Sequence, residues 1–342
     1  MRDVTPALLS AGRVLVRLPN WLGDALMARP FLLALRAAAP RAVVTAVGPP
    51  ALLELLAGDA AWDEALSWPL SPGAEFPRMG RPDVAFVLPP SFSSARFAWS
   101  VGARLRVGFS GEFRDLMLTR ALRRPARGER HLACEYLSLL GEMRRGLPVV
   151  TPLRLSAAAG EQAAALLAET GLEGRPLAVL APGAVYGPAK RWPADRFAAL
   201  ATGLVARGHA VAVCGGASER EACGSVVAAC GPGAVTLAGR TSLPVQAALC
   251  ARAAVVVSND SGMAHLAGAA GAPTVAIFGS TASAWTAPLG PRVRVLQRPP
   301  VCSPCFRRTC RIGYACLGSI SVEDVVRAVA DLVDGVPREV TA

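Results

Sequence analysis

One lysine stands among the 36 basic residues of this chain, Lys190 in the stretch APGAVYGPAKRWP. Lysine is favoured over arginine where a compact ammonium serves better than a planar guanidinium. An expected strand at 177–180 and a loop containing Gly183 and Gly187 precede it, and a helix should begin near Pro193. Backbone N–H groups, a helix N-terminus and an ammonium together predict a site for an anion such as a phosphate. The alternative is a solvated lysine in a turn, and a Walker-type loop is excluded because GxxxxGK[ST] is absent.

A polar stretch, SNDSG, directly follows the strand expected at 254–257 and begins another helix. Ligands of doubly wound sheets bind at the carboxyl ends of strands, where this stretch must lie. Asp260, Ser261 and the N–H group of Gly262 are therefore candidates for binding a phosphate-bearing ligand, with His265 one turn further on. In the alternative interpretation, Asp260 or Ser261 only caps the helix and His265 is a core histidine.

An acidic residue follows the strand expected at 210–214. Glu219 comes just after two glycines at the end of this strand, where an acid can accept hydrogen bonds from ribose hydroxyls. Glu221 is the second candidate, and a solvated glutamate at a helix start is the alternative.

The loop PNWLGD, after the strand expected at 13–18, carries the candidate for proton transfer. Asp24 either caps the following helix or acts as a general base that deprotonates an acceptor hydroxyl. No Ser-His-Asp arrangement competes with it. Asn20 and Trp21 of the same loop are candidate acceptor contacts.

Arginines are concentrated in residues 96–131, where nine of them face three acids. The local balance of +6 is more than half of the net charge of +11. We expect an anion-binding or bilayer-facing surface here, with Arg114 and Arg120 near an acceptor; a solvated face is the alternative. Nucleic acid is not an expected partner, because reader motifs are absent and aromatic residues make up only 6% of the chain.

Nine cysteines in a chain without a signal-peptide pattern predict a reduced, cytoplasmic protein. Four of them fall within fifteen residues: Cys302, Cys305, Cys310 and Cys316. Four thiolates can hold a structural zinc ion, but this spacing matches no common zinc motif. We expect a reduced or adventitiously oxidised loop and no metal.

These candidates all follow strands in a strand–loop–helix–strand pattern that runs through the chain twice. The fold class is therefore α/β, with two facing Rossmann-like domains built on parallel sheets. We expect the domains to span 1–155 and 156–342. The amphipathic last helix, 322–332, is expected to pack back on the first domain.

Four stretches together resemble glycosyltransferase family 9, the bacterial heptosyltransferases of the lipopolysaccharide inner core. They are PNWLGDALMARP, APGAVYGPAKRWP, SNDSGMAHLAGAAGAPTVAIFG and CSPCFRRTC. They span nearly the whole chain in the family's order. The resemblance implies a GT-B fold with an interdomain cleft, in which 1–155 is the acceptor-binding domain and 156–342 the nucleotide-sugar-binding domain. It also implies inverting transfer of L-glycero-D-manno-heptose from ADP-heptose to heptosyl-Kdo-lipid A, as the second heptose, without an obligatory metal.

The resemblance also assigns roles. Asp24 matches the family's proposed base and Lys190 its diphosphate-binding lysine, whereas Glu219 fits the ribose acid only loosely. The nucleotide-sugar loop corresponds to Asp260, Ser261, Gly262 and His265. The implied acceptor places the protein at the cytoplasmic face of the inner membrane. The alternatives are another nucleotide sugar or glycan acceptor, or a non-catalytic protein that binds nucleotide or anionic lipid.

Overall fold

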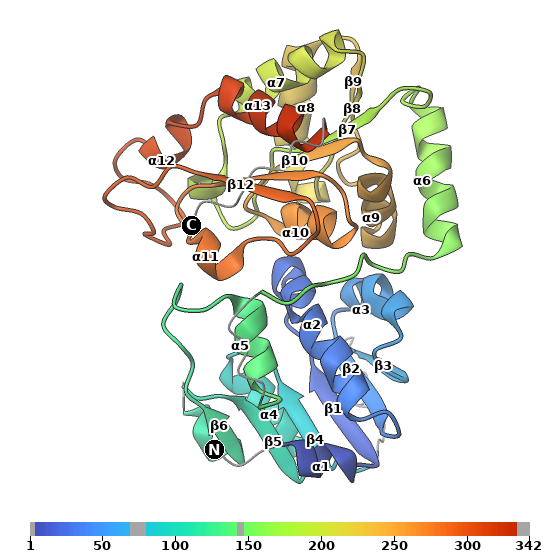
Figure 1. The fold of residues 1–342 in the computed structure, drawn as a ribbon, viewed down its shortest axis with the longest axis vertical. Helices are drawn as coiled ribbons and strands as arrows, with labels where there is room; N and C mark the ends of the chain where they lie inside the picture. Colours follow the sequence, from blue (N-terminus) through green and yellow to red (C-terminus); the bar gives the residue numbers. More distant parts are fainter. Residues whose placement is uncertain (1–3, 69–79, 112, 142–146, 334–342) are drawn as a thin grey trace. The chain divides into compact units, whose positions relative to one another are not determined.

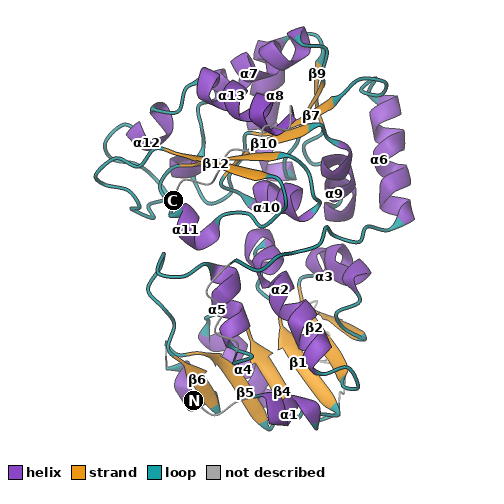
Figure 2. Cartoon of the chain, in the orientation of Figure 1, coloured by secondary structure: helices purple, strands orange, loops and turns teal. Residues whose placement is uncertain are grey.

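The computed structural model describes residues 4–68, 80–111, 113–141 and 147–333. The chain divides into two compact units, Met1–Val149 and Val150–Ala342, a few residues before the expected boundary at 155/156. Each unit contains one six-stranded parallel sheet with helices packed on both faces (Figure 1; Figure 2). The expected α/β class, with two doubly wound parallel sheets, is confirmed.

The first unit alternates strands with helices. Its strands are β1 (Arg13–Arg17), β2 (Val43–Gly48), β3 (Glu64–Ser67), β4 (Val84–Val87), β5 (Leu105–Phe109) and β6 (Arg120–Leu122). Its helices are α1 (Thr5–Leu9), α2 (Leu22–Ala38), α3 (Pro50–Leu56), α4 (Phe92–Ser100) and α5 (Leu132–Ser138), with 3₁₀ turns η1 (Ala57–Asp59) and η2 (Arg114–Leu116). The strands lie in the order β3-β2-β1-β4-β5-β6.

The second unit repeats the plan. Its strands are β7 (Leu177–Ala181), β8 (Ala210–Val213), β9 (Ala234–Thr236), β10 (Val255–Asn259), β11 (Thr274–Phe278) and β12 (Val293–Gln297). Its longer helices are α6 (Ala157–Glu169), α7 (Ala194–Ala206), α8 (Arg220–Cys230), α9 (Leu243–Arg252), α10 (Gly262–Ala269) and α13 (Val322–Val333). Shorter turns are η3 (Pro188–Lys190), η4 (Ala217–Glu219), α11 (Ser283–Thr286) and α12 (Ala315–Gly318). The strand order is β12-β11-β10-β7-β8-β9.

Burial explains why the central strands form where they do. Every residue of β7, β10 and β11 is buried. Such continuous runs of small and branched apolar residues are typical of parallel strands covered by helices on both faces. The polar residues therefore gather just beyond the strand ends.

The strand order of each sheet reverses at one point, between β1 and β4 and between β7 and β10. Ligands of open α/β sheets bind outside the carboxyl ends of the strands at such a reversal. PNWLGD follows β1 in the first unit, while the lysine-bearing loop and SNDSG follow β7 and β10 in the second. The fold thus brings the candidate stretches to the expected edges.

The last helix has its packing partners in the second unit. The apolar face of α13 packs on α7 and on β10, β11 and β12 of this unit. Val325, Ala328 and Val329 are buried in the hydrophobic core of the second sheet. The amphipathic pattern of a helix predicts that one face is buried. It does not indicate which sheet that face packs against.

Candidate functional site

An ion pair stands at the strand reversal of the second unit. Lys190, at the end of η3, places Nζ 2.7 Å from Oδ2 of Asp260, directly after β10. The Asp260 side chain is 3% exposed and that of Lys190 is 15% exposed. The carboxylate also accepts a hydrogen bond from the hydroxyl of Thr281. Asp260 therefore holds the ammonium in place while part of Lys190 remains open to solvent.

Asn259, which was not among the predicted site residues, fixes the lysine loop (residues 182–190) to the sheet. Its Nδ2 donates to the carbonyl oxygen of Pro182 at 2.7 Å, and its Oδ1 accepts from the backbone N–H of Trp192 at 2.9 Å. The indole of Trp192 is buried and donates to the carbonyl oxygen of Ile320 at 2.9 Å. One amide therefore holds both ends of the loop. The position of Asn259 in SNDSG, at the end of an expected strand, is the sequence feature that could have identified it as a site residue.

The N-terminus of α10 adjoins the ion pair, because the helix begins two residues after Asp260. Ser261 is the N-cap, and its Oγ accepts from the N–H of Met263 at 3.3 Å. Gly262 is the first helical residue, and His265 lies in the next turn with its side chain buried. In this structure Ser261 therefore caps the helix, as the alternative interpretation predicts. The positive end of the helix dipole still points to the edge where Lys190 lies.

Glu219 and Gly183 lie against each other at the ends of β8 and β7. Oε2 of Glu219 accepts from the N–H of Gly216 at 2.8 Å. A Cβ on Gly183 would stand 2.0 Å from Oε1 of Glu219, so a larger residue at position 183 would push this carboxylate aside. Glu221, the second candidate, is exposed on α8. As the candidate acceptor for ribose hydroxyls, the geometry favours Glu219 over Glu221.

The cysteine loop (residues 299–314) packs against the lysine loop and is hydrogen-bonded to it. The ring of Tyr186 lies 4.9 Å from Nζ of Lys190, and the Arg308 guanidinium lies 5.6 Å from the same ring. Arg308 donates from Nε to the carbonyl oxygen of Tyr186 at 2.7 Å and accepts from the N–H of Ala189 at 3.0 Å. Tyr186 in turn donates its hydroxyl to the carbonyl oxygen of Phe306 at 2.6 Å. These contacts join segments more than a hundred residues apart, and no motif in the sequence predicts them.

The three cysteines of this loop and Cys316, which follows it in α12, are free thiols. Within the described residues, no group of three or more His, Cys, Asp or Glu side chains could hold a metal ion. Hydrogen bonds from the backbone N–H groups of Ile312 and Tyr314 lower the pKa of the Cys310 thiol. Burial raises the pKa of Cys316.

In the first unit, Asp24 lies in the first turn of α2, two residues after the helix begins. The N-cap is Trp21, so the interpretation of Asp24 as the N-cap is wrong. Helix α2 packs against α5. The pKa of the buried Tyr136 on α5 is raised well above its ordinary value, first by burial and then by the charge of Asp24. The half-buried Asp24 carboxylate therefore lies in the neighbourhood of the Tyr136 phenol.

A buried arginine holds the PNWLGD loop. Arg17, at the end of β1, donates from Nη2 to Oδ1 of Asn20 at 2.7 Å and from Nη1 to the carbonyl oxygen of Leu18. Burial lowers its pKa to about 10, so the guanidinium stays charged at neutral pH. Trp21 beside it is exposed. The Asn20 side chain thus stabilises the loop through Arg17. Arg17 was not among the predicted site residues, because its sequence position shows only one more positive charge.

The two arginines expected near an acceptor differ. Arg114 is fully buried and donates from Nη1 to the carbonyl oxygen of Pro89 at 2.6 Å. The prediction that Arg114 contacts an acceptor is therefore corrected, because its side chain supports the loop after β4. Arg120 is half-buried on the edge strand β6.

Two doubly wound units, one with an ammonium and a helix N-terminus at its strand reversal, define a protein of the GT-B glycosyltransferase architecture. The sequence profile of glycosyltransferase family 9 (heptosyltransferase) matches residues 78–315. The chain belongs to this family, and it is a glycosyltransferase.

Known proteins agree with this assignment. Lipopolysaccharide heptosyltransferase 2 of Escherichia coli is 33% identical over 307 residues, covering 83% of this chain and 88% of the relative. The structure of E. coli ADP-heptose LPS heptosyltransferase II superposes with a TM-score of 0.79 at 27% identity, covering 94% of this chain and 99% of that one. A family 9 glycosyltransferase from Veillonella parvula shares the fold, with a TM-score of 0.81 at 24% identity over 96% and 98% of the two chains.

Proposed function

We propose that this protein is an inverting heptosyltransferase of lipopolysaccharide inner-core synthesis. It moves L-glycero-D-manno-heptose from ADP-heptose to heptosyl-Kdo-lipid A. The observation that carries the donor half is the Lys190–Asp260 pair beside the N-terminus of α10. Similarity to a relative and a solved structure that are both heptosyltransferases of the second type supports the sugar and the acceptor.

The second unit binds the donor in this proposal. Lys190 has three N–H donors, of which Asp260 engages one, so the others serve the diphosphate. The N-terminus of α10, at Gly262 and near His265, adds backbone N–H groups and a positive dipole. Glu219, held against Gly183, accepts hydrogen bonds from the ribose hydroxyls.

The first unit supplies the base. Asp24 takes the proton of the attacking acceptor hydroxyl, and Arg17 holds the loop in front of it through Asn20. Trp21 and Arg120 are proposed acceptor contacts, with Trp21 exposed for the purpose.

The reaction is a single displacement at the anomeric carbon. The acceptor oxygen forms a bond to this carbon as the bond to the diphosphate oxygen breaks, and the configuration inverts. The acceptor proton goes to Asp24, and the electron pair leaves with ADP. Lys190 and the α10 N-terminus stabilise the negative charge that develops on the leaving diphosphate. Since these groups stabilise the leaving group, the proposed scheme assigns no obligatory metal or cofactor.

The acceptor is a lipid, so we propose peripheral contact with the cytoplasmic face of the inner membrane. Among the described residues, no helix is both long and apolar enough to cross a bilayer. Arginine-rich residues 96–131 are suited to the acidic groups of such an acceptor.

Substitution of Asp24 tests the division of labour. Asp24→Ala should lower acceptor-dependent release of ADP about 10²- to 10⁴-fold, because general base catalysis is lost. ADP affinity by calorimetry should stay the same, since ADP is assigned to the other unit. Asp195→Ala is the matched control, because Asp195 occupies the first turn of α7 in the same way.

Two outcomes would change the proposal. An Asp24→Ala protein that turns over normally would remove the base assignment but leave the donor site. A wild type that binds ADP yet transfers no heptose would point to another nucleotide sugar, found with a donor panel, or to a non-catalytic binding protein.

A further inference from the structure

Helix α4 turns large aromatic side chains toward solvent. It buries Ser94, Ala95, Phe97 and Ala98 and packs on β4 and β5. Its opposite stripe carries Phe92, Arg96 and Trp99, spaced i, i+4 and i+7 and all exposed. Residues at this spacing share one helix face. A face made of Phe, Arg and Trp is unlike the polar outer face of an ordinary surface helix.

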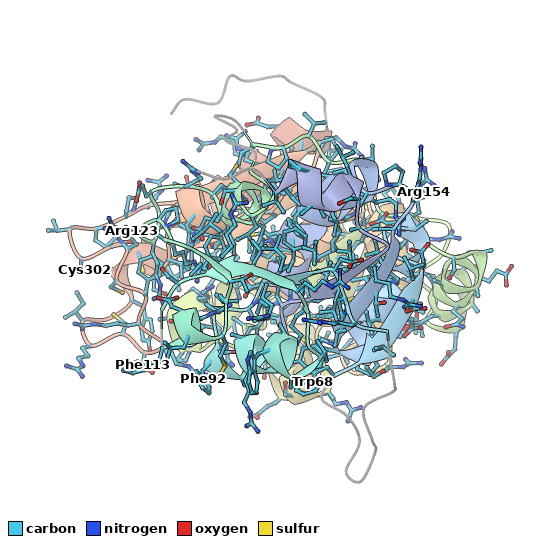
Figure 3. The ribbon with its side chains drawn as sticks, turned by 90° about the horizontal axis from the view of Figure 1, so that it is seen from below. Trp68, Phe92, Phe113, Arg123, Arg154 and Cys302 are labelled. Carbon is cyan, nitrogen blue, oxygen red and sulfur yellow. The ribbon has the colours of Figure 1, made fainter. Side chains whose placement is uncertain are left out.

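The turn η2 extends this apolar stripe. Phe113 and Leu116 are both 85% exposed, and η2 contacts α4. Figure 3 shows Phe92 and Phe113 next to each other at the outer edge of the first unit. Phe113 has φ 59°, in the left-handed region that a bulky residue seldom adopts. The backbone therefore takes an unfavourable conformation while its phenyl ring faces water.

These five residues, Phe92, Arg96, Trp99, Phe113 and Leu116, form what we call the α4–η2 face. Their composition matches that of segments that lie in the interface of a bilayer, where Trp and Phe enter the headgroup region. Residues 96–131, the stretch of sequence that contains most of this face, carry a net charge of +6, and eight of their nine arginines, all except the buried Arg114, are partly or fully exposed. That charge attracts an anionic lipid surface and acts over about a Debye length.

We propose that the α4–η2 face is a membrane-docking surface. Its aromatic side chains enter the headgroup layer of an anionic phospholipid bilayer, and the neighbouring arginines bind the phosphates. The inference deepens the proposed function and rests on it in one respect, because docking would bring the acceptor-binding unit to a lipid-borne acceptor.

Vesicle binding tests the surface directly. Wild-type protein should sediment with vesicles of phosphatidylethanolamine and phosphatidylglycerol. The double variant Trp99→Ser/Phe113→Ser should bind at least about tenfold more weakly, and Arg96→Gln about fivefold more weakly. Leu9→Ser is the matched control, since Leu9 is also an exposed apolar residue of the first unit, and it should bind like wild type. The Arg96 effect should disappear on phosphatidylcholine vesicles.

An activity assay separates docking from catalysis. The double variant should keep wild-type turnover on an acceptor freed of its acyl chains and lose about tenfold on the same acceptor embedded in vesicles. If wild type transfers no heptose to either acceptor, the proposed function fails while vesicle sedimentation still reports on docking.

Two results would overturn the docking proposal. One is vesicle binding of the double variant equal to that of wild type. The other is wild-type protein that dimerises without lipid while the double variant stays monomeric, because the face would then be an interface between copies of this chain.

Discussion

Lys190 and Asp260 depend on each other at the level of single residues. A buried carboxylate is stable only when it is paired, and an ammonium is useful at a ligand site only when its position is fixed. The 2.7 Å contact satisfies both needs. We therefore treat Asp260 as the residue that holds the lysine and not as a direct phosphate ligand.

Charge removal at this pair separates stability from catalysis. Lys190→Met should lower kcat/KM for the donor at least about 10²-fold and, by leaving Asp260 buried without its cation, cost about 3 kcal/mol in the free energy of unfolding. Lys190→Met/Asp260→Asn should regain most of that free energy in urea unfolding, because no unpaired charge remains. It should regain no activity. A double variant with restored turnover would contradict the role of Lys190.

A titrating carboxylate in the first unit offers a second test. Oδ2 of Asp83 accepts from the N–H groups of Gly12 at 2.9 Å and Arg13 at 3.1 Å, which links the beginnings of β4 and β1. The hydrogen bond from Arg13, followed by that from Gly12, lowers the pKa of this carboxyl below its ordinary value.

The sign of the pH effect follows from that lowered pKa. The carboxylate stabilises the fold fully above the unfolded value of about 3.9, and this stabilisation is lost as the pH falls through the lower folded pKa. Asp83→Asn should therefore be less stable than wild type at pH 7, and the two urea midpoints should converge once the pH has fallen below the folded pKa of Asp83. A difference that persists unchanged at that acidity would show that the charge of Asp83 is not responsible.

At the scale of elements, the donor site depends on three loops that fasten one another. Asn259 joins SNDSG to the lysine loop, and Arg308 joins the lysine loop to the cysteine loop. Since the lysine loop has no regular structure except the η3 turn, these contacts set the position of Lys190. The cysteine loop thus has a structural role independent of any metal.

Two glycines of positive φ test this contact. Gly187 has φ +149°, and a Cβ there would stand 2.5 Å from the carbonyl oxygen of Arg308. Gly208 has φ +85°, and a Cβ there would meet nothing within 4 Å. Gly208→Ala should cost about 1 kcal/mol of unfolding free energy from backbone strain alone.

Gly187→Ala should cost more than Gly208→Ala, because the loops must also separate. It should raise the KM for the donor several-fold, whereas Gly208→Ala should not. Equal donor KM values for the two variants would mean that the cysteine loop does not position Lys190.

At the scale of the whole molecule, repeated patterns proved predictable and long-range contacts did not. The doubly wound sheets follow from buried strands alternating with helices, and the positions of Lys190 and SNDSG at strand ends follow from the same alternation. The partner of α13, the burial of Arg114 and the support from Arg308 each depend on side chains far apart in the sequence. Local spacing carries no information about such pairs.

Acceptor-dependent release of ADP from ADP-heptose is the most direct measurement of the central claim. Wild-type protein is mixed with ADP-heptose, with or without mono-heptosylated Kdo–lipid A, and both ADP and the mass of the lipid are followed. We predict that ADP appears only when the acceptor is present and that the lipid gains the mass of one heptose. ADP-heptose left intact in the presence of the acceptor, or ADP released with no change in the lipid, would contradict heptose transfer to this acceptor.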